Sequence, residues 1–275
     1  MAEITAAAVK SLRDKTQLPM MECKRALQES GGDESAAFEL LRKQGKKTME
    51  ARAGRETEFG RIAVYADLAQ KVGAIVEVRC ESGPVAGSQD FIDLANQVAE
   101  QLATGPGASD AESLLAQPAP GNPSRTLADL KDDLSNKMRE VFQVARILRI
   151  DGPCGGYAHH TGTQGALVEV EGDNAALAKE IAMHVVAMRP KAVSKDELPA
   201  DLVQKEREIL SEAARKEGKP ENIIEKMVEG RLRNYFAEQV LAEQPFVKDD
   251  QQTVGKVAAA GGLKLKQFVF WQLGK

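Results

Sequence analysis

The sequence is poor in the residue types on which many catalytic and nucleic-acid-binding sites depend. Its 275 residues include only 3 cysteines, 3 histidines and 1 tryptophan, and aromatic residues make up 4%. So few aromatic side chains argue against a surface on which nucleic-acid bases stack. The 37 basic residues are outnumbered by 41 acidic ones, which gives a net charge of −4. A nucleic-acid-binding protein needs a basic face for phosphates, so we expect no nucleic-acid partner.

The cysteines and the hydropathy pattern indicate where the protein works. Cys23, Cys80 and Cys154 are far apart and form no C-x-x-C motif, which is typical of reduced thiols in a cytosolic protein. No run of about 18 apolar residues is present, so the sequence predicts no membrane span. The amino terminus lacks the apolar segment of a signal peptide. We therefore expect a cytoplasmic protein without a membrane partner.

The three histidines, His159, His160 and His184, do not predict a metal centre. Zinc ligands must converge at about 2.0–2.2 Å, whereas His159 and His160 are adjacent and would point to opposite faces of a strand. His184 lies next to an apolar helical stripe, which favours a structural role. The sequence contains no P-loop and no G-x-S-x-G motif. We expect no cofactor, no metal and no catalytic chemistry, with a metal- or thiol-dependent enzyme as an alternative of a different class.

Residues 1–45 predict three short helices. Apolar residues recur at helical spacing in three stretches, each followed by a glycine or a tight turn. The stripes are Ile4, Ala8, Val9 and Leu12; Met20, Cys23 and Leu27; and Ala37, Leu40 and Leu41. Gly45 is expected to end the third helix. Because Met20 and Met21 point about 100° apart on a helix, they cannot be equally buried, and one of them is expected at the surface, which favours a binding surface.

An internal repeat follows a polar tract, residues 46–58, which we interpret as a linker. Seven residue pairs are identical at a constant offset of 92, which indicates duplicated units. The pairs are Gly60/Gly152, Tyr65/Tyr157, Gly73/Gly165, Ala74/Ala166, Val76/Val168, Glu77/Glu169 and Val78/Val170. Each unit predicts two strands around a turn and then a helix. We divide this part into core subdomain one, residues 59–140, and core subdomain two, residues 141–275.

The remaining segments complete an α+β fold class. Residues 105–123 are rich in proline and small residues and predict a loop with at most a helical turn. Residues 127–148 predict a long helix that runs into a strand at 144–150. Residues 198–232 predict two helices joined by a turn, and their charges of alternating sign suit a helical hairpin in water.

Several blocks of the sequence resemble one protein family over nearly the whole chain. The amino-terminal block is Val9, Lys10, Leu12, Arg13, Thr16, Met20, Met21, Cys23, Lys24, Ala26, Leu27, Gly32, Asp33, Ala36, Ala37, Leu41, Arg42, Lys43 and Gly45. Further blocks lie within residues 181–191, 205–208, 218–232 and 244–255. Together they resemble translation elongation factor Ts. The resemblance implies a small ubiquitin-associated-like three-helix domain, followed by a duplicated α+β core with an inserted helical hairpin.

The resemblance also implies a function. Members of this family are guanine nucleotide exchange factors that bind elongation factor Tu in its GDP-bound and nucleotide-free forms and disturb its phosphate loop and magnesium site. The positions that would contact this partner are Leu12, Met20, Met21, Met138, Arg139 and His159, and the magnesium-displacing segment would be Ser82, Gly83, Pro84 and Val85.

The chain departs from the family pattern at two places within this expected site. The family segment typically reads Thr-Asp-Phe-Val, whereas residues 82–85 here read Ser-Gly-Pro-Val and supply neither a carboxylate nor a ring. Met138 and Arg139 stand where the family usually has isoleucine and glycine. Two hypotheses remain open: exchange through the backbone of a broad interface, or binding to elongation factor Tu without efficient exchange.

Overall fold

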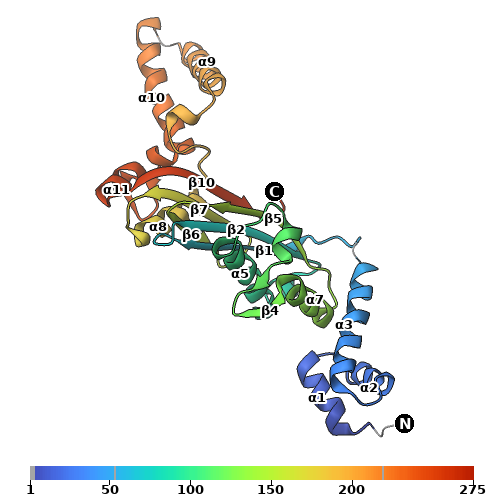
Figure 1. Cartoon of the computed structure of the whole chain (residues 1–275). Helices are drawn as coiled ribbons and strands as arrows, with labels where there is room; N and C mark the ends of the chain where they lie inside the picture. The colour runs from blue at the N-terminus through green and yellow to red at the C-terminus, as the bar shows by residue number, and fades with distance from the viewer. Residues whose placement is uncertain (1–3, 53, 219) are drawn as a thin grey trace. The chain divides into compact units, whose positions relative to one another are not determined.

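The computed structural model describes residues 4–52, 54–218 and 220–275 (Figure 1). These residues form two compact units, which are described separately. The first comprises the described residues of Met1–Ala63 together with Val76–Ile147 and Gly274, and the second comprises Val64–Ile75, Leu148–Leu273 and Lys275. Groups of helices are followed by antiparallel strand pairs along the chain, which confirms the predicted α+β class.

A three-helix bundle begins the first unit (Figure 1). Its helices are α1 (Ala6–Thr16), α2 (Met20–Glu29) and α3 (Glu34–Glu50). The hydroxyl of Thr5 accepts a hydrogen bond from the Ala8 amide at 3.2 Å and so caps the start of α1. Gly31 and Gly32 adopt positive φ angles of 63° and 91° in the turn between α2 and α3, a conformation that favours glycine. The predicted apolar stripes contribute to the core of the bundle, except for Met20, which is exposed.

Helix α3 continues past Gly45, so the prediction that this glycine ends the helix is wrong. A Cβ atom at position 45 would lie 2.6 Å from Cγ of Asn136 on helix α7 (Leu127–Met138). The glycine is therefore explained by the close approach of α7 and not by a helix end. The first part of the expected linker, residues 46–50, is helical as a result.

A three-stranded sheet follows the bundle in the chain, and its residues 59–63, 76–80 and 143–147 belong to the first unit. In chain order the elements are β1 (Phe59–Asp67), β2 (Val72–Cys80), α4 (Gly83–Ala86), α5 (Gln89–Thr104), α6 (Ala111–Leu115), β3 (Pro118–Ala119), β4 (Asn122–Thr126), α7 and β5 (Gln143–Ile150). The sheet has the order β1-β2-β5. Helix α5 buries its predicted apolar stripe, and the Phe91 ring meets Phe142 edge-on with centroids 4.9 Å apart.

Two predictions about this region need correction. Residues 105–123 contain α6 and the short strand β3, because Asp110 and Ser113 form a reciprocal capping box that starts α6. The helix predicted over 127–148 ends at Met138, where Arg139 takes a left-handed φ of 59°. The strand predicted at 144–150 is confirmed as part of β5.

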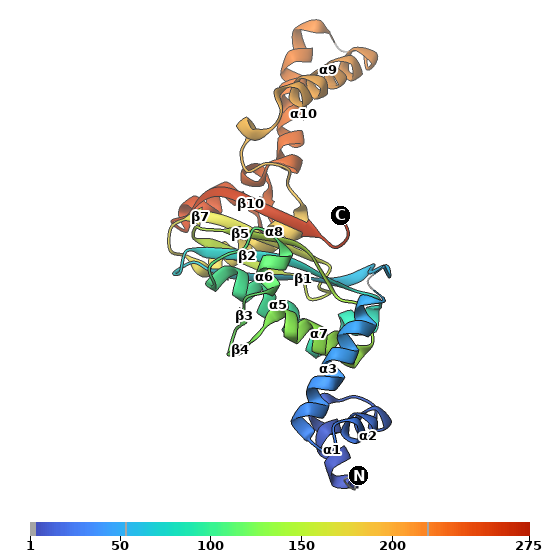
Figure 2. The same cartoon turned by 45° about the vertical axis from the view of Figure 1, so that its right-hand side comes forward.

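The second unit repeats this plan. Its elements are β6 (Cys154–Ala158), β7 (Gln164–Glu171), α8 (Ala175–Met188), α9 (Ala200–Lys216), α10 (Glu221–Gln239), β8 (Pro245–Phe246), β9 (Asp249–Thr253), α11 (Val254–Ala260) and β10 (Lys264–Gln272). The sheet has the order β10-β7-β6, and α8 packs against it (Figure 2). The approach is so close that a Cβ at Gly155 would lie 2.3 Å from the Ala178 carbonyl oxygen.

The duplication extends further than the predicted offset of 92. The hairpin β3–β4 pairs Pro118 with Thr126, and β8–β9 pairs Pro245 with Thr253. Thr126 and Thr253 each cap the helix that follows. This second offset is 127, so 35 residues are inserted in the second repeat between its core helix and β8. The insertion corresponds to the helical hairpin of α9 and α10.

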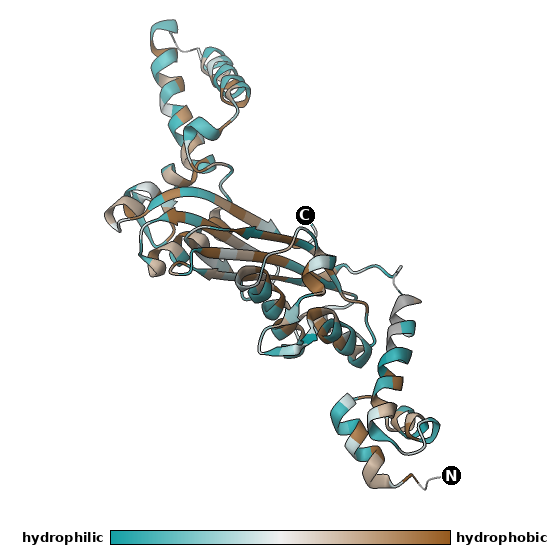
Figure 3. Cartoon of the chain, viewed as in Figure 1, coloured by the Kyte–Doolittle hydropathy of each residue, from teal (hydrophilic) through white to brown (hydrophobic). Residues whose placement is uncertain are grey.

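The hairpin is mostly hydrophilic in sequence, as predicted (Figure 3). Its small core contains Ala214, Ile224, Val228 and Leu232. Helix α10 continues to Gln239, beyond the predicted end at 232. Tyr235 and Phe236 explain this extension, because they pack against a second cluster that contains Ala192, Leu198 and Val240.

Candidate interaction surface

The expected contact residues of the bundle differ in exposure. Met20 and Met21 at the start of α2 are 51% and 65% exposed, so both methionines reach the surface. Leu12 is 0% exposed and belongs to the bundle core. A partner cannot touch a fully buried side chain, and the structure therefore argues against Leu12 as a contact residue. Its role is to hold the three helices together.

Met138 and Arg139 lie at the carboxyl end of α7, close to α2. Met138 is half-buried. Arg139 is exposed, and its guanidinium nitrogen Nη2 lies 2.6 Å from Oε1 of Glu22, the residue that follows Met21. Arg52 also donates to the Arg139 carbonyl at 2.9 Å. These contacts place the end of α7 beside the exposed methionines. Arg139 makes these contacts from a left-handed backbone conformation, which favours the glycine that the family usually has at this position.

The segment Ser82–Val85 begins the short helix α4, whose start is fixed by a carboxylate from elsewhere in the chain. Glu140 accepts hydrogen bonds through Oε2 from the amides of Ser82 at 3.1 Å and Glu81 at 3.2 Å. Its Oε1 atom accepts from the Ser82 hydroxyl at 2.5 Å. In return, Glu81 accepts from the Val141 amide at 2.8 Å. Through these hydrogen bonds, residues 81–82 and residues 140–141 hold each other in place at the start of the segment.

The surroundings of these hydrogen bonds shift the pKa values of Glu81 and Cys80. Burial by itself would raise the pKa of Glu81, but the Val141 amide and the Arg55 guanidinium hold it below its usual value. Burial raises the pKa of the Cys80 thiol to about 11, and this thiol donates to the Ser82 carbonyl at 3.3 Å. The thiol is therefore neutral at physiological pH and acts as a packing group.

The structure therefore joins most of the expected site residues within the first unit. Glu22 links α2 to Arg139, and the next residue along the chain, Glu140, holds Ser82. Helix α2, which carries the exposed methionines, the end of α7 and the start of the segment Ser82–Val85 are thus connected through the contacts of Glu22 and Glu140. Glu140 is the residue that sequence reasoning missed, because its contacts are with residues 58 and 59 positions earlier in the chain.

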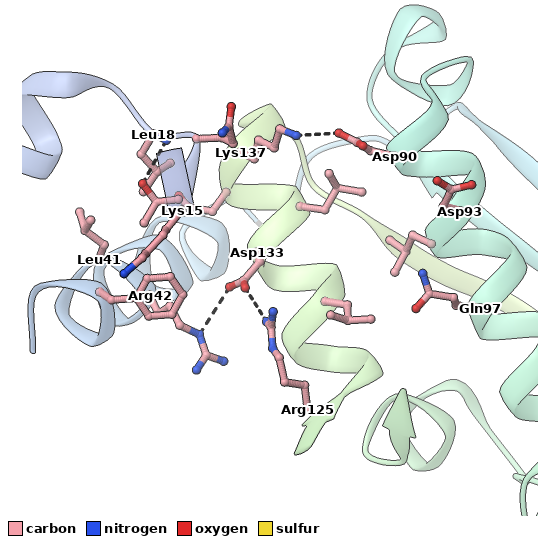
Figure 4. A pocket seen from close by; sticks show the side chains of 17 residues that line it. Lys15, Leu18, Leu41, Arg42, Asp90, Asp93, Gln97, Arg125, Asp133 and Lys137 are labelled. Carbon is pink, nitrogen blue, oxygen red and sulfur yellow. Dashed lines mark hydrogen bonds and ion pairs between the residues drawn. The ribbon is translucent and has the colours of Figure 1, made fainter. Parts of the chain in front are cut away.

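Ion pairs fasten helix α3 of the bundle to α7. Figure 4 shows Arg42 of α3 and Arg125 reaching the same carboxylate, Asp133. Arg42 also pairs with Asp129. A cleft of about 430 Å³ opens beside these residues, and the 2.7 Å ion pair between Lys137 and Asp90 lies along its lining. The cations named here, Arg42, Arg125 and Lys137, each have an acidic partner.

His159 lies in the second unit, in the turn after β6. It is half-buried, and its Nδ1 atom lies 2.7 Å from the Thr161 hydroxyl. The expectation that His159 and His160 point to opposite faces is wrong, because both follow the last strand residue and their ring centroids are 4.1 Å apart. Within residues 4–52, 54–218 and 220–275, the structure shows no group of three or more metal-ligating side chains.

His184 is a buried structural residue, as its place beside an apolar stripe predicted. Its Nδ1 atom accepts from the Val247 amide at 3.1 Å, so Nε2 carries the proton and donates to Oε1 of Gln244 at 2.9 Å. Burial lowers the pKa of His184, and the hydrogen bond to Gln244 only partly opposes this effect. The imidazole is therefore neutral at physiological pH. In the part of the chain that the structure describes, no helix has the length and apolar character needed to traverse a bilayer.

Comparison with known proteins identifies the class of protein. A family model described as Elongation factor TS matches residues 83–275. Elongation factor Ts of Thioalkalivibrio sulfidiphilus is 42% identical over 275 residues, which cover 99% of this chain and 92% of the relative. Elongation factor Ts of Kineococcus radiotolerans is 41% identical over 280 residues, with 100% of both chains covered.

Together with the α+β fold, these similarities define a translation elongation factor. The expected resemblance is confirmed over the full length of the chain. The chain belongs to the elongation factor Ts family.

Proposed function

We propose that this chain is a guanine nucleotide exchange factor that acts on elongation factor Tu. It binds the GDP-bound partner, disturbs the magnesium and phosphate site, and so promotes the release of GDP. The observation that carries the proposal is the connected surface of the first unit, which joins Met20 and Met21 to the segment Ser82–Val85 in a member of this family. The chain performs no bond-breaking chemistry of its own in this proposal.

Exchange requires a difference in affinity. A factor weakens the binding of GDP only if it binds the nucleotide-free partner more tightly than the GDP-bound partner, and the coupling is reciprocal. A difference of about 1.4 kcal/mol corresponds to a factor of ten in affinity. A broad surface can provide this amount through several contacts, even though Gly83 and Pro84 offer neither a carboxylate nor a ring.

The backbone of the segment Ser82–Val85 supports this proposal. Glu140 holds the start of the segment through three hydrogen bonds, none of which involves a side chain at position 83 or 84. Pro84 is exposed, and Val85 is half-buried. Because its start is already fixed, the segment can contact a partner through its backbone with little loss of conformational entropy on binding.

A stopped-flow measurement tests the proposal. We expect the chain to accelerate the release of a fluorescent GDP analogue from elongation factor Tu, and an unchanged rate at saturating concentration would contradict it. The double substitution Gly83→Asp, Pro84→Phe restores a carboxylate and a ring, and we expect it to release GDP faster than the unsubstituted chain. An equal or slower rate would contradict our account of this segment.

The loss of the carboxylate and the ring favours a second candidate function, in which the chain binds elongation factor Tu without efficient exchange. Such a protein would bind the GDP-bound and nucleotide-free forms with similar affinity. The metal-dependent alternative has no comparable support, since metal-ligating side chains do not cluster in the described residues. Metal analysis of the purified protein and of a His159→Ala variant would revive it if bound zinc were lost on substitution.

Three further parts of the proposal follow from family membership. The three-helix bundle is of the ubiquitin-associated type and docks on elongation factor Tu through Met20 and Met21. His159 contacts the same partner, with its Nε2 atom available as a donor when Nδ1 accepts from Thr161. The protein acts in the cytoplasm. A His159→Ala variant should bind elongation factor Tu more weakly, which titration calorimetry can measure.

A further inference from the structure

Phe59 is an exposed aromatic side chain in a polar stretch of the first unit. It is the first residue of β1 and is 47% exposed. Its neighbours Glu56 and Glu58 are also exposed. An aromatic ring left in water loses the free energy that burial would provide. Aromatic side chains exposed in this way are enriched where proteins bind one another.

The ring of Phe59 lies directly against the segment Ser82–Val85. A Cβ atom at Gly83 would be 3.5 Å from the ring carbons Cδ1 and Cε1. Gly83 has no side chain, so the ring borders the segment's backbone. Pro84, the next residue, is exposed. Phe59 therefore extends the candidate surface at the place where the segment itself has no aromatic side chain.

The backbone on both sides of Phe59 is held in place. Thr57 is 9% exposed, and its hydroxyl donates to the side-chain oxygen of Gln143 at 3.3 Å. Gly60 has a φ of 155°, and a Cβ there would lie 2.2 Å from the Val78 carbonyl oxygen of β2. Because the flanking chain is fixed by these contacts, the ring can be bound by a partner with little loss of conformational entropy.

We propose that Phe59 is the apolar anchor of this surface and enters an apolar pocket of elongation factor Tu beside the segment Ser82–Val85. The inference rests on the proposed function. It supplies from β1 the ring that residues 82–85 lack. Anchors of this kind carry a large share of binding free energy, because a buried aromatic ring excludes water from a rigid contact. Among the exposed large hydrophobic residues that the described part of the chain shows in the first unit, Met20 and Met21 lie on α2 and Phe59 is the aromatic one.

The test compares Phe59→Ala with two further variants. Binding to nucleotide-free elongation factor Tu is measured by titration calorimetry, and GDP release is measured by stopped flow at saturating factor. Val247→Ala is the control, because Val247 is 48% exposed and lies outside the proposed surface. Phe59→Leu keeps apolar bulk and separates the loss of a hydrophobic contact from the loss of the ring. Circular dichroism of each variant checks that it is folded.

We expect Phe59→Ala to weaken binding to the nucleotide-free partner roughly tenfold, since about half of the ring becomes newly buried in the complex. The affinity of Phe59→Leu should lie between that of Phe59→Ala and that of the unsubstituted chain. The affinity of Val247→Ala should equal that of the unsubstituted chain. Adding Pro84→Phe to Phe59→Ala should recover part of the loss by returning a ring to the same surface.

Two results would count against different claims. If the unsubstituted chain accelerates GDP release and a folded Phe59→Ala variant binds and accelerates equally well, Phe59 only covers Gly83 and the inference is wrong. If the unsubstituted chain does not accelerate release, the proposed function fails, whatever Phe59 does.

Discussion

The carboxylate of Glu140 should determine how firmly the segment Ser82–Val85 is held. Replacing Glu140 by alanine removes three hydrogen bonds, two from the amides of Glu81 and Ser82 and one from the Ser82 hydroxyl. The two amides would then depend on water. Each hydrogen bond to a charged group contributes about 1.5–3 kcal/mol in a protein. The site is only partly buried, so water recovers much of this, and we expect a net loss of about 2–3 kcal/mol.

Comparison with the second repeat shows why this loss of stability should be confined to the segment Ser82–Val85 at the start of α4. At the corresponding helix start, Asn174 caps α8 with its own side chain, which accepts from the Leu177 amide at 3.1 Å. The same side chain donates to the Gly261 carbonyl at 3.3 Å. Ser82 makes no such side-chain cap for α4. The start of α4 therefore relies on Glu140, while the start of α8 does not rely on a distant carboxylate.

Amide hydrogen exchange measured by NMR tests this reasoning. In Glu140→Ala the amides of Glu81 and Ser82 should exchange about 30- to 150-fold faster, which corresponds to the loss of about 2–3 kcal/mol. Ser82→Ala is the matched control, because it removes only the hydrogen bond from the hydroxyl and should reduce the stability of the segment by about 1 kcal/mol. Unchanged exchange at these two amides in Glu140→Ala would refute the argument, as would an equal effect of both substitutions.

Three further predictions concern stability and reactivity. Burial lowers the pKa of His184 in the folded chain, so as the pH falls this imidazole is protonated in the unfolded chain before it is protonated in the folded one. Stability should therefore fall as pH drops below the ordinary value of 6.5, and urea unfolding of His184→Gln should lack this part of the decline. Gly155→Ala should lower the free energy of unfolding by about 3 kcal/mol or more because α8 must move, whereas Gly230→Ala, with no atom within 4 Å in an exposed helix, should raise it by up to about 1 kcal/mol. Burial raises the pKa of Cys80 to about 11 and of Cys154 to about 12, so both thiols should react with a disulfide reagent at pH 8 only after unfolding.

Much of the fold could be predicted from local patterns. The bundle helices follow from apolar residues at helical spacing, and the repeat at offset 92 predicted the strand pairs β1–β2 and β6–β7 with their core helices. The pattern also contained the correction to Leu12. Its position on the stripe with Ile4 and Val9 predicts burial, and Leu12 is fully buried in the structure.

The remaining features depend on contacts between distant parts of the chain. The local sequence at Gly45 is typical of a helix end, because the approach of Asn136, 91 residues later, leaves no sign in it. Glu140 lies within the helix predicted over 127–148, and its partners Glu81 and Ser82 are 59 and 58 residues earlier in the chain. The second offset of 127 has few identical pairs, among them Gln117/Gln244, Pro118/Pro245 and Thr126/Thr253, and the matching hairpins β3–β4 and β8–β9 make it evident.

Titration calorimetry with the two forms of elongation factor Tu tests the central claim most directly. The unsubstituted chain should bind the nucleotide-free form at least about tenfold more tightly than the GDP-bound form, a difference of about 1.4 kcal/mol. Equal affinities for the two forms, or no complex with either, would contradict the account.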